Sequence, residues 1–94
     1  RASCFGQGLV VQLAFDPVAW EEYSWWLAND RKTLVRINKL LDDVLRNPRS
    51  GIGKPEPLRG FDAEVWSRRI TLEHRLVYRV TQDSITVLAC KHHY

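Results

Sequence analysis

The chain has 94 residues, of which 45% are hydrophobic, and a formal net charge of +3 at pH 7. This length predicts a single domain, and this share of apolar residues excludes an intrinsically disordered chain. No apolar run approaches the roughly 18 residues of a membrane span, and the chain does not open with the apolar stretch of a signal peptide, so we expect a soluble, cytoplasmic protein without a membrane partner.

The first segment of the chain carries no structural signal. Residues 1–8 (RASCFGQG) have no periodicity and contain two glycines, so we expect a disordered extension or a remnant of cloning. The domain itself is expected to span residues 9–94. Its first element is a short strand over Leu9–Phe15, where β-branched residues are frequent.

Two helices are predicted next. Asp16 and Pro17 suit the N-cap and the first position of a helix that ends near Asn29. A second helix is expected from Arg31 to Arg46, because apolar residues recur there at helical spacing. The short connection between the two makes them a helical hairpin.

A loop and three strands make up the rest of the chain. Residues 47–64 hold three prolines and three glycines, which predicts an ordered but irregular loop. Three runs rich in β-branched and aromatic residues follow, with turn residues between them, at Val65–Ile70, Arg75–Val80 and Ile85–Cys90. We expect these three strands to form an antiparallel meander.

The predicted order of elements is β-α-α-β-β-β. A helical hairpin has to bury its apolar stripe, and one face of the sheet is the only partner that this order offers. We therefore predict a two-layer α+β domain in which the hairpin packs on one face of an antiparallel sheet. The other face, or its rim, is left for polar chemistry.

Arginines on the predicted strands are the first candidates for a functional role. Alternation places Arg75 and Arg79 on one face of their strand. It sends Arg68 and Arg69 to opposite faces of theirs, so one of that pair shares a side of the sheet with Arg75. A guanidinium on a strand presents a rigid fork of donors to a phosphate. The alternative is that such arginines only keep a solvated face from aggregating.

An acid and two histidines are the next candidates. Glu56 lies between two prolines, whose rings restrict the backbone on both sides. His92 and His93 follow the last strand, and because adjacent residues of an extended chain face opposite ways, one imidazole can enter a given site. The alternatives are an incidental acid on a stiff loop and a solvated pair at the terminus.

Glutamate, arginine and histidine together suit RNA cleavage without a metal ion. That reaction requires a base for the 2′-hydroxyl, a cation for the pentacoordinate phosphate and an acid for the leaving 5′-oxygen. Residues 1–47 contain six basic and six acidic residues, whereas residues 48–94 contain eight and five, and a basic second half suits a polyanion partner. Cys4 and Cys90 are expected to be thiols and no spacing suits zinc, so we expect neither a metal nor a cofactor.

Four blocks of sequence, in order, resemble a known family. They are GKPEPL at Gly53–Leu58, WSRRI at Trp66–Ile70, EHRLVY at Glu73–Tyr78 and the closing His93-Tyr94. They are similar to the YoeB (Txe) toxins of the RelE/ParE superfamily, which belong to type II toxin–antitoxin systems, and the likeness covers about residues 9–94. The resemblance implies a RelE-like fold and an endonuclease that cuts mRNA in the ribosomal A site without a metal ion, and so inhibits translation.

The resemblance implies a role for each matching catalytic residue. Glu56 matches the general base, Arg75 the arginine that stabilises the phosphate, and His93 the general acid. Tyr94 matches a terminal tyrosine that shapes the site and orients the RNA. Because the ribosome contributes groups of its own, the acid and base roles of Glu56 and His93 stay open to exchange.

Three further cations are expected to contact RNA phosphates. Arg69 matches a basic residue near the scissile phosphate, Arg59 stands where the family often has lysine, and Lys54 belongs to the GKPEPL block. His92 replaces an aromatic residue that is common before the terminal pair. That replacement leaves open which imidazole is active, although strand alternation favours His93.

The family also implies partners. An antitoxin of the Phd/YefM type is expected to wrap the domain with a disordered C-terminal segment that folds on binding. The ribosome and mRNA are the expected targets, and homodimers are common among such toxins. Operator DNA is expected to be bound only indirectly, through the antitoxin.

Two other functions stay open at this point. ParE relatives with the same fold poison DNA gyrase without RNA chemistry, and a decayed toxin would only help its antitoxin to repress the operon. The joint presence of Glu56, Arg75, His93 and Tyr94 argues against both alternatives.

Overall fold

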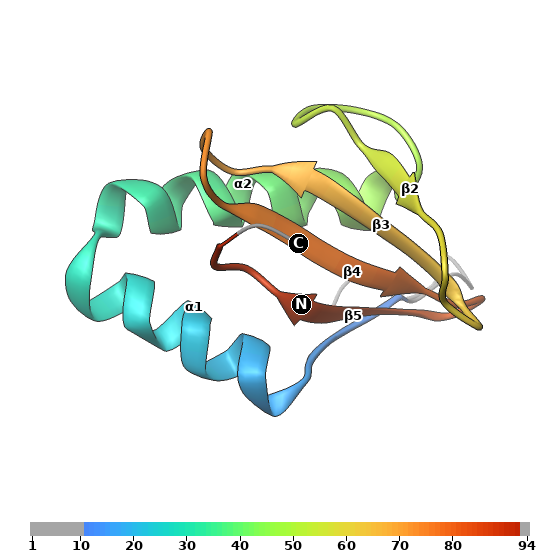
Figure 1. Cartoon of the computed structure of the whole chain (residues 1–94), viewed down its shortest axis with the longest axis horizontal. Coiled ribbons are helices and arrows are strands. Elements are labelled where there is room, and N and C mark those ends of the chain that lie inside the picture. Colours follow the sequence, from blue (N-terminus) through green and yellow to red (C-terminus); the bar gives the residue numbers. More distant parts are fainter. Residues whose placement is uncertain (1–10, 93–94) are drawn as a thin grey trace.

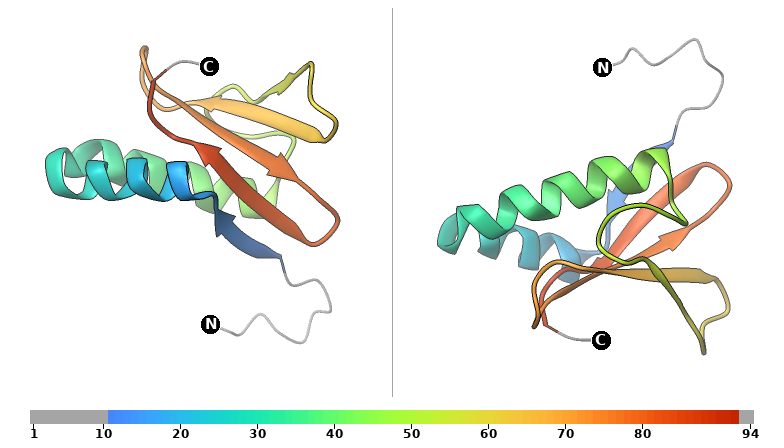
Figure 2. Two further views of the ribbon diagram at one scale, coloured as in Figure 1. Left: turned by 60° about the horizontal axis from the view of Figure 1, so that its bottom comes forward. Right: turned by 90° about the horizontal axis from the view of Figure 1, so that it is seen from above.

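The computed structural model of the chain describes residues 11–92. It has two helices on one face of a five-stranded sheet (Figures 1 and 2). The elements in chain order are β1 (Gln12–Phe15), α1 (Pro17–Asn29), α2 (Arg31–Arg46), β2 (Glu56–Leu58), β3 (Glu64–Arg69), β4 (Arg75–Val80) and β5 (Ser84–Ala89). The predicted α+β class, with a helical hairpin packed on one face of the sheet, is confirmed. The predicted extension over residues 1–8 lies outside the described residues.

The order of the strands in the sheet is β1-β5-β4-β3-β2. The predicted antiparallel meander is confirmed, because β3 pairs with β4 and β4 with β5 in antiparallel fashion. Two features differ from the prediction. The first strand runs parallel to β5, so the sheet is mixed, and a short additional strand, β2, pairs with β3 within the predicted loop. Two prolines flank or interrupt β2, and proline is tolerated in a sheet only at an edge such as this one.

The predicted helix bounds are confirmed at both ends. Asp16 occupies the N-cap position of α1 and Pro17 follows it, although the Asp16 side chain makes no capping hydrogen bond. At the start of α2, the Asp30 carboxylate accepts hydrogen bonds from the backbone N–H of Thr33, at 3.1 Å, and from its hydroxyl, at 2.8 Å. Such a cap satisfies donors that a helix N-terminus otherwise leaves unpaired, and it separates the two helices at a defined residue.

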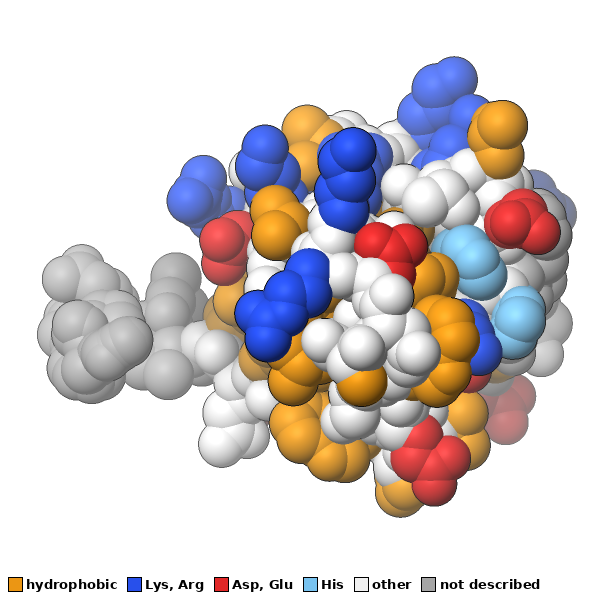
Figure 3. Space-filling view, turned by 90° about the vertical axis from the view of Figure 1, so that its left-hand side faces the viewer, with side chains coloured by type: hydrophobic (Ala, Val, Ile, Leu, Met, Phe, Trp, Pro, Cys, Tyr) orange, Lys and Arg blue, Asp and Glu red, His pale blue; other side chains and the backbone are white. Residues whose placement is uncertain are grey.

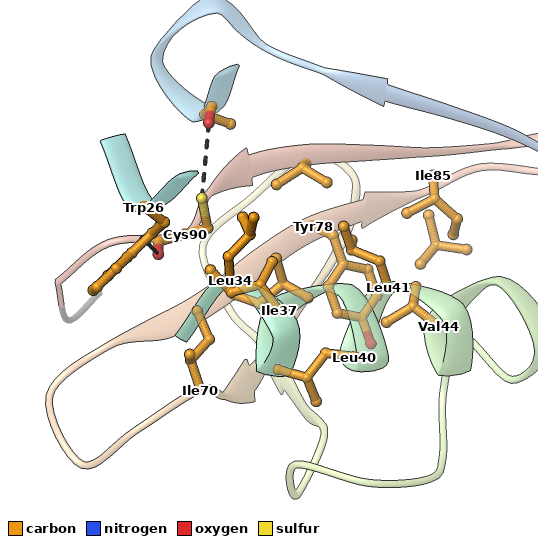
Figure 4. Packing of buried hydrophobic residues seen from close by; sticks show 14 residues of the cluster. Trp26, Leu34, Ile37, Leu40, Leu41, Val44, Ile70, Tyr78, Ile85 and Cys90 are labelled. Atoms are coloured by element: carbon orange, nitrogen blue, oxygen red, sulfur yellow. Dashed lines mark hydrogen bonds between the residues drawn. The ribbon is translucent and has the colours of Figure 1, made fainter. Parts of the chain in front are cut away.

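The hydrophobic core lies between the hairpin and the sheet (Figure 4). The buried stripe of α2 supplies the largest share of it, with Leu34, Ile37, Leu40, Leu41 and Val44. The sheet contributes alternate residues of its central strands, among them Leu76, Tyr78, Ile85 and Val87. Each large side chain buried in this way stabilises the fold by roughly 1.5–3 kcal/mol. None of the helices within residues 11–92 is both long and apolar enough to cross a membrane.

One charged side chain is buried within this layer. The side chain of Arg68, on β3, is 0% exposed, and its guanidinium donates hydrogen bonds to five acceptors. The acceptors are the Tyr78 hydroxyl at 3.0 Å, the Asp43 carboxylate at 2.6 Å, and the backbone carbonyls of Ile52 at 3.1 Å, Asn47 at 2.5 Å and Ser50 at 2.7 Å. All five N–H donors of the side chain are therefore satisfied. They tie the loop after α2 to the sheet.

Two glycines allow the loop to approach this guanidinium. Gly51 has φ +122° and Gly53 has φ +80°, a region that L side chains rarely adopt. A Cβ at Gly51 would meet the Asp43 carboxylate, and a Cβ at Gly53 would come within 2.7 Å of Leu40. The loop therefore requires glycine at both positions for space as well as for backbone conformation.

We expect Arg68→Met to lower the free energy of unfolding by roughly 3 kcal/mol or more. Loss of the guanidinium leaves the Asp43 carboxylate and several backbone carbonyls without a hydrogen-bond donor in a partly buried environment. Urea unfolding followed by tryptophan fluorescence measures this loss. Arg69→Met is the matched control, since Arg69 is the next residue of β3 and points to the other face. Equal losses in the two variants would contradict the role of Arg68.

The Asp43–Arg68 pair predicts a dependence of stability on pH. The hydrogen bond from Arg68, followed by that from the Ile52 N–H, lowers the pKa of Asp43 below its ordinary value of 3.8. A lowered folded-state pKa stabilises the protein above the unfolded-state value, and this contribution is lost as the pH falls through the folded-state pKa. The stability difference between wild type and Asp43→Asn should therefore be largest near pH 7 and shrink below about pH 3.8. Urea midpoints at pH 7 and pH 3 measure it, with the exposed neighbour Asp42→Asn as control.

Candidate active site

The sheet face opposite the helices carries the polar residues that the sequence singled out. Glu56 of β2 is the direct partner of Ser67 on β3, and Arg69 of β3 is the direct partner of Arg75 on β4. Residues paired directly across strands project on the same side of a sheet, and alternation puts Ser67 and Arg69 on one side of β3. The prediction that one of the two arginines of β3 shares a side with Arg75 is confirmed, and that residue is Arg69.

Glu56 and Arg75 lie in contact on this face. Nη1 of Arg75 is 3.3 Å from Oε1 of Glu56 and 3.4 Å from the hydroxyl of Ser67. The Glu56 side chain is 62% exposed and that of Arg75 is 23% exposed, so water and a large ligand can reach the carboxylate while the guanidinium is partly enclosed. Two of the three side chains expected to converge are therefore side by side. The contact with Ser67 was not predicted, although its position two residues before Arg69 placed it on the same face.

The backbone around Glu56 is fixed from both directions. Pairing of β2 with β3 holds the strand, and the backbone N–H of Arg69 donates to the Gly53 carbonyl at 2.7 Å. Lys54 follows with φ 51°, an unusual conformation for a residue with a side chain, and it turns the chain into Pro55. The carboxylate of Glu56 therefore projects from a short strand that the anchored loop positions.

The three further cations occupy the surroundings of this strand. Lys54 and Arg59 are exposed on the two sides of β2, one just before it and one just after it. Arg69 is half-buried at the end of β3, where its carbonyl accepts a hydrogen bond from Nη2 of Arg36 at 3.3 Å. Two exposed basic residues thus flank β2 in the sequence, which suits contacts to a polyanion.

The other two predicted catalytic residues, His93 and Tyr94, lie outside the described residues. The described chain ends at His92, whose carbonyl accepts a hydrogen bond from the backbone N–H of Arg75 at 3.1 Å. The end of the described chain therefore touches the strand that carries the guanidinium. The imidazole of His92 is at the surface beside that of His74, with ring centroids 5.6 Å apart. Figure 3 shows two histidine side chains close together, in pale blue, on a face that also carries Lys and Arg side chains.

Helix α1 anchors the segment that leads to this end. The backbone N–H of Cys90 donates to the Glu22 carboxylate at 2.7 Å, and the Cys90 carbonyl accepts from Nε1 of Trp26 at 2.9 Å. Nζ of Lys91 lies 4.0 Å from the centroid of the Trp25 ring, a cation–π contact.

Burial, and then the charge of Glu22, raises the pKa of the Cys90 thiol to about 12. Cys90 is a free cysteine, as predicted, whereas Cys4 lies outside the described residues.

The chemistry of this arrangement suits a polymeric phosphodiester. The Glu56 side chain is 62% exposed, so the site lies at the surface of the molecule, and no pocket forms around it within residues 11–92. A carboxylate that can accept a proton and a guanidinium that can hold a phosphate are in direct contact on it. Within the same residues no group of three or more metal-ligating side chains comes together.

Comparison with known proteins identifies related chains. A family model described as the YoeB-like toxin of bacterial type II toxin–antitoxin systems matches residues 15–94. The toxin YoeB of Mycobacterium bovis is 56% identical over 80 residues, which are 85% of this chain and 94% of that protein.

Solved structures agree with this likeness. The YoeB dimer of Staphylococcus aureus has a TM-score of 0.83 at 44% identity, and the same toxin in a heterotetrameric YoeB–YefM toxin–antitoxin complex has a TM-score of 0.80 at 44% identity. In both cases the match covers 89% of this chain and 98% of the other. A chain of the archaeal RelE–RelB complex from Pyrococcus horikoshii matches 89% of this chain and 96% of that one with a TM-score of 0.69 at 15% identity, a likeness of fold alone. The predicted RelE-like fold is thereby confirmed.

We expect the buried thiol of Cys90 to resist modification in the folded protein. A pKa of about 12 leaves roughly one thiolate in ten thousand at pH 8, and the thiolate is the reactive form. In a Cys4→Ser variant, which leaves Cys90 as the single thiol, reaction with Ellman's reagent at pH 8 should be at least about 100-fold slower without urea than in about 8 M urea. A reaction as fast in the folded as in the unfolded protein would contradict the burial of this side chain.

Proposed function

The chain belongs to the YoeB-like toxins of bacterial type II toxin–antitoxin systems, and we propose that it is a metal-independent endoribonuclease that cleaves mRNA in the ribosomal A site. Cleavage there would stop translation, which accounts for toxicity. The observation that carries the proposal is the contact of Glu56 with Arg75, 3.3 Å apart on the sheet face that no helix covers. A base and a phosphate-binding cation are the minimum that such a reaction demands.

Each proposed step moves one proton or one bond. The Glu56 carboxylate takes the proton of a 2′-hydroxyl, and the resulting oxygen attacks the adjacent phosphorus. Arg75 stabilises the extra negative charge of the pentacoordinate phosphate. His93 gives a proton to the 5′-oxygen as the bond from phosphorus to that oxygen breaks, which leaves a 2′,3′-cyclic phosphate and a free 5′-hydroxyl. Tyr94 orients the RNA.

The weakness of the Glu56–Arg75 contact supports this sequence of events. An exposed ion pair contributes only about 0–1 kcal/mol, and here a single contact of 3.3 Å joins the two side chains. A phosphate can therefore replace the carboxylate on Arg75 at little cost. That replacement frees Glu56 to act as a base at the moment when the substrate arrives.

Binding of the RNA would draw on the surrounding cations. Lys54 and Arg59 at the two ends of β2 and Arg69 at the end of β3 would neutralise phosphates on either side of the scissile bond. Contacts of this kind supply most of the affinity of a protein for nucleic acid and weaken as salt rises. The ribosome, which orders the mRNA, is the proposed larger partner.

We propose for this chain the same kinds of partner that the S. aureus structures contain, an antitoxin and a second copy of the toxin. We infer a cognate antitoxin of the YefM type that binds the toxin, and a toxin that can form homodimers. Operator DNA would be contacted through the antitoxin. The place of action of an enzyme that depends on ribosomes is the cytoplasm.

We expect Glu56→Gln, Arg75→Ala and His93→Gln each to fold and to lose cleavage of mRNA on programmed ribosomes by about 100-fold or more, the usual size of a lost proton-transfer partner or of lost transition-state charge stabilisation. Primer extension on mRNA from translating ribosomes measures the cut. A chelator selective for transition metals, added at constant Mg²⁺ so that the ribosome stays assembled, should leave the single-turnover rate unchanged.

Glu73→Gln is the matched control for the acid, because Glu73 is exposed in the turn before β4 and has no part in the proposed reaction. Wild-type cleavage by all three active-site variants would contradict the catalytic roles proposed for these residues. A protein that cuts no mRNA but inhibits gyrase in a supercoiling assay would instead be a non-catalytic toxin of the ParE kind.

A further inference from the structure

We propose that His74 is a positioning residue for the catalytic end of the chain. Its imidazole Nδ1 accepts a hydrogen bond from the backbone N–H of His92 at 2.6 Å, and this bond holds the backbone of the residue that precedes His93 in the sequence. The inference rests on the proposed function, since it gives His74 a part in placing the proposed acid. His74 itself touches neither substrate nor reacting atoms in this scheme.

The backbone of His92 is held on both sides. Its N–H is bonded to His74, and its carbonyl accepts from the backbone N–H of Arg75 at 3.1 Å. Because His74 and Arg75 are consecutive, both bonds tie His92 to one point at the start of β4. The proposed phosphate-binding guanidinium leaves the backbone at the same point, so the two bonds fix the end of the described chain relative to Arg75.

The conformation of His92 requires such support. Its φ is 72°, in the left-handed region that a residue with a Cβ enters only at a cost in free energy. An unsupported chain would relax toward the ordinary extended or helical regions and leave the sheet in another direction. The two hydrogen bonds of the His92 backbone offset that cost and keep the turn.

His74 is rigid enough to serve as an anchor. Its backbone N–H donates to the Thr71 hydroxyl at 3.1 Å, and its carbonyl accepts from the N–H groups of Ile70 at 2.9 Å and Thr71 at 3.2 Å. The imidazole packs edge-on against the buried Trp26 ring, with centroids 4.8 Å apart and an interplanar angle of 86°. The acceptor atom is therefore fixed from the turn on one side and from α1 on the other.

His74 supplies the last of a series of constraints on this segment. Side chains of α1 hold both backbone groups of Cys90, through Glu22 and Trp26. Between Cys90 and the end of the described chain, the bond from His74 is the one side-chain hydrogen bond to the backbone that the structure records for residues up to 92. A loss of that bond would leave the backbone of His92 held to the sheet through its carbonyl.

The chemistry of the acceptor separates this role from simple packing. Nδ1 accepts only when it carries no proton, so the ring proton is on Nε2. In the His74→Asn variant the amide oxygen can take nearly the place of Nδ1, whereas the amide of glutamine extends one bond further. Alanine offers no acceptor. A positional role thus predicts that His74→Asn rescues what His74→Ala loses, and that His74→Gln does not.

Single-turnover cleavage of mRNA on saturating programmed ribosomes tests the proposal. We expect His74→Ala and His74→Gln to cleave about 10- to 100-fold more slowly than wild type, the size of effect that a small misplacement of a reacting group produces, with unchanged half-saturating ribosome concentration. His74→Asn should come within about threefold of wild type. Glu73→Gln, the neighbour in the same turn, is the control and should cleave at the wild-type rate.

A second readout does not depend on activity. In nitrogen-15-labelled protein the His74 imidazole should show the Nε2–H tautomer, and the His92 amide should exchange with solvent at least about tenfold more slowly in wild type and His74→Asn than in His74→Ala. A His92 amide that exchanges equally fast in all three proteins would overturn the proposal.

The two readouts distinguish the possible failures. If wild type cleaves, Glu56→Gln does not, and His74→Ala cleaves as fast as wild type, then His74 has no positioning role while the proposed function stands. If wild type cuts no mRNA on ribosomes, the proposed function fails, and the exchange of the His92 amide still decides whether His74 holds the end of the chain.

Discussion

The arrangement of the site depends on one buried cation. Arg68 has no exposed side-chain surface, and each of its five N–H groups meets an acceptor. A buried charge is costly unless it is fully satisfied, so the loop after α2 cannot move away without leaving that charge unpaired. The loop in turn delivers the chain to β2, and β2 carries Glu56. A residue of the helix-covered face of the sheet thereby fixes a residue of the opposite face.

The two faces of the sheet divide stability from chemistry. One face is covered by the helical hairpin and holds the apolar core together with Arg68. The other face has no helix over it and holds Glu56, Ser67 and Arg75, all on strands with paired neighbours. Because strands hold side-chain directions more firmly than loops do, groups placed on them need little reorganisation when a substrate binds. Alternation along β3 alone assigns Arg68 to one face and Ser67 to the other.

Much of this could be predicted from the sequence, and the limits have physical causes. The bounds of the helices and the meander follow from local periodicity and caps, which short segments reveal. Strand β2 was missed because prolines depress strand propensity and only its edge position tolerates them. The parallel pairing of β1 depends on a partner more than 60 residues away, for which no local signal exists. Alternation showed that Arg68 and Arg69 diverge, but it did not show which of the two is buried.

Two arginines of this sheet illustrate how the same side chain serves opposite needs. Arg68 is joined to its carboxylate partner at 2.6 Å and to four further acceptors, and any release of it would loosen the loop. Arg75 contacts Glu56 at 3.3 Å, and the Glu56 side chain is 62% exposed. Such an exposed ion pair breaks at a small cost in free energy. A cation that has to receive a substrate must exchange its partner readily, whereas a cation that shapes the site must not exchange at all. The degree of satisfaction of each guanidinium, rather than its residue type, therefore separates the structural arginine from the one proposed to act on RNA.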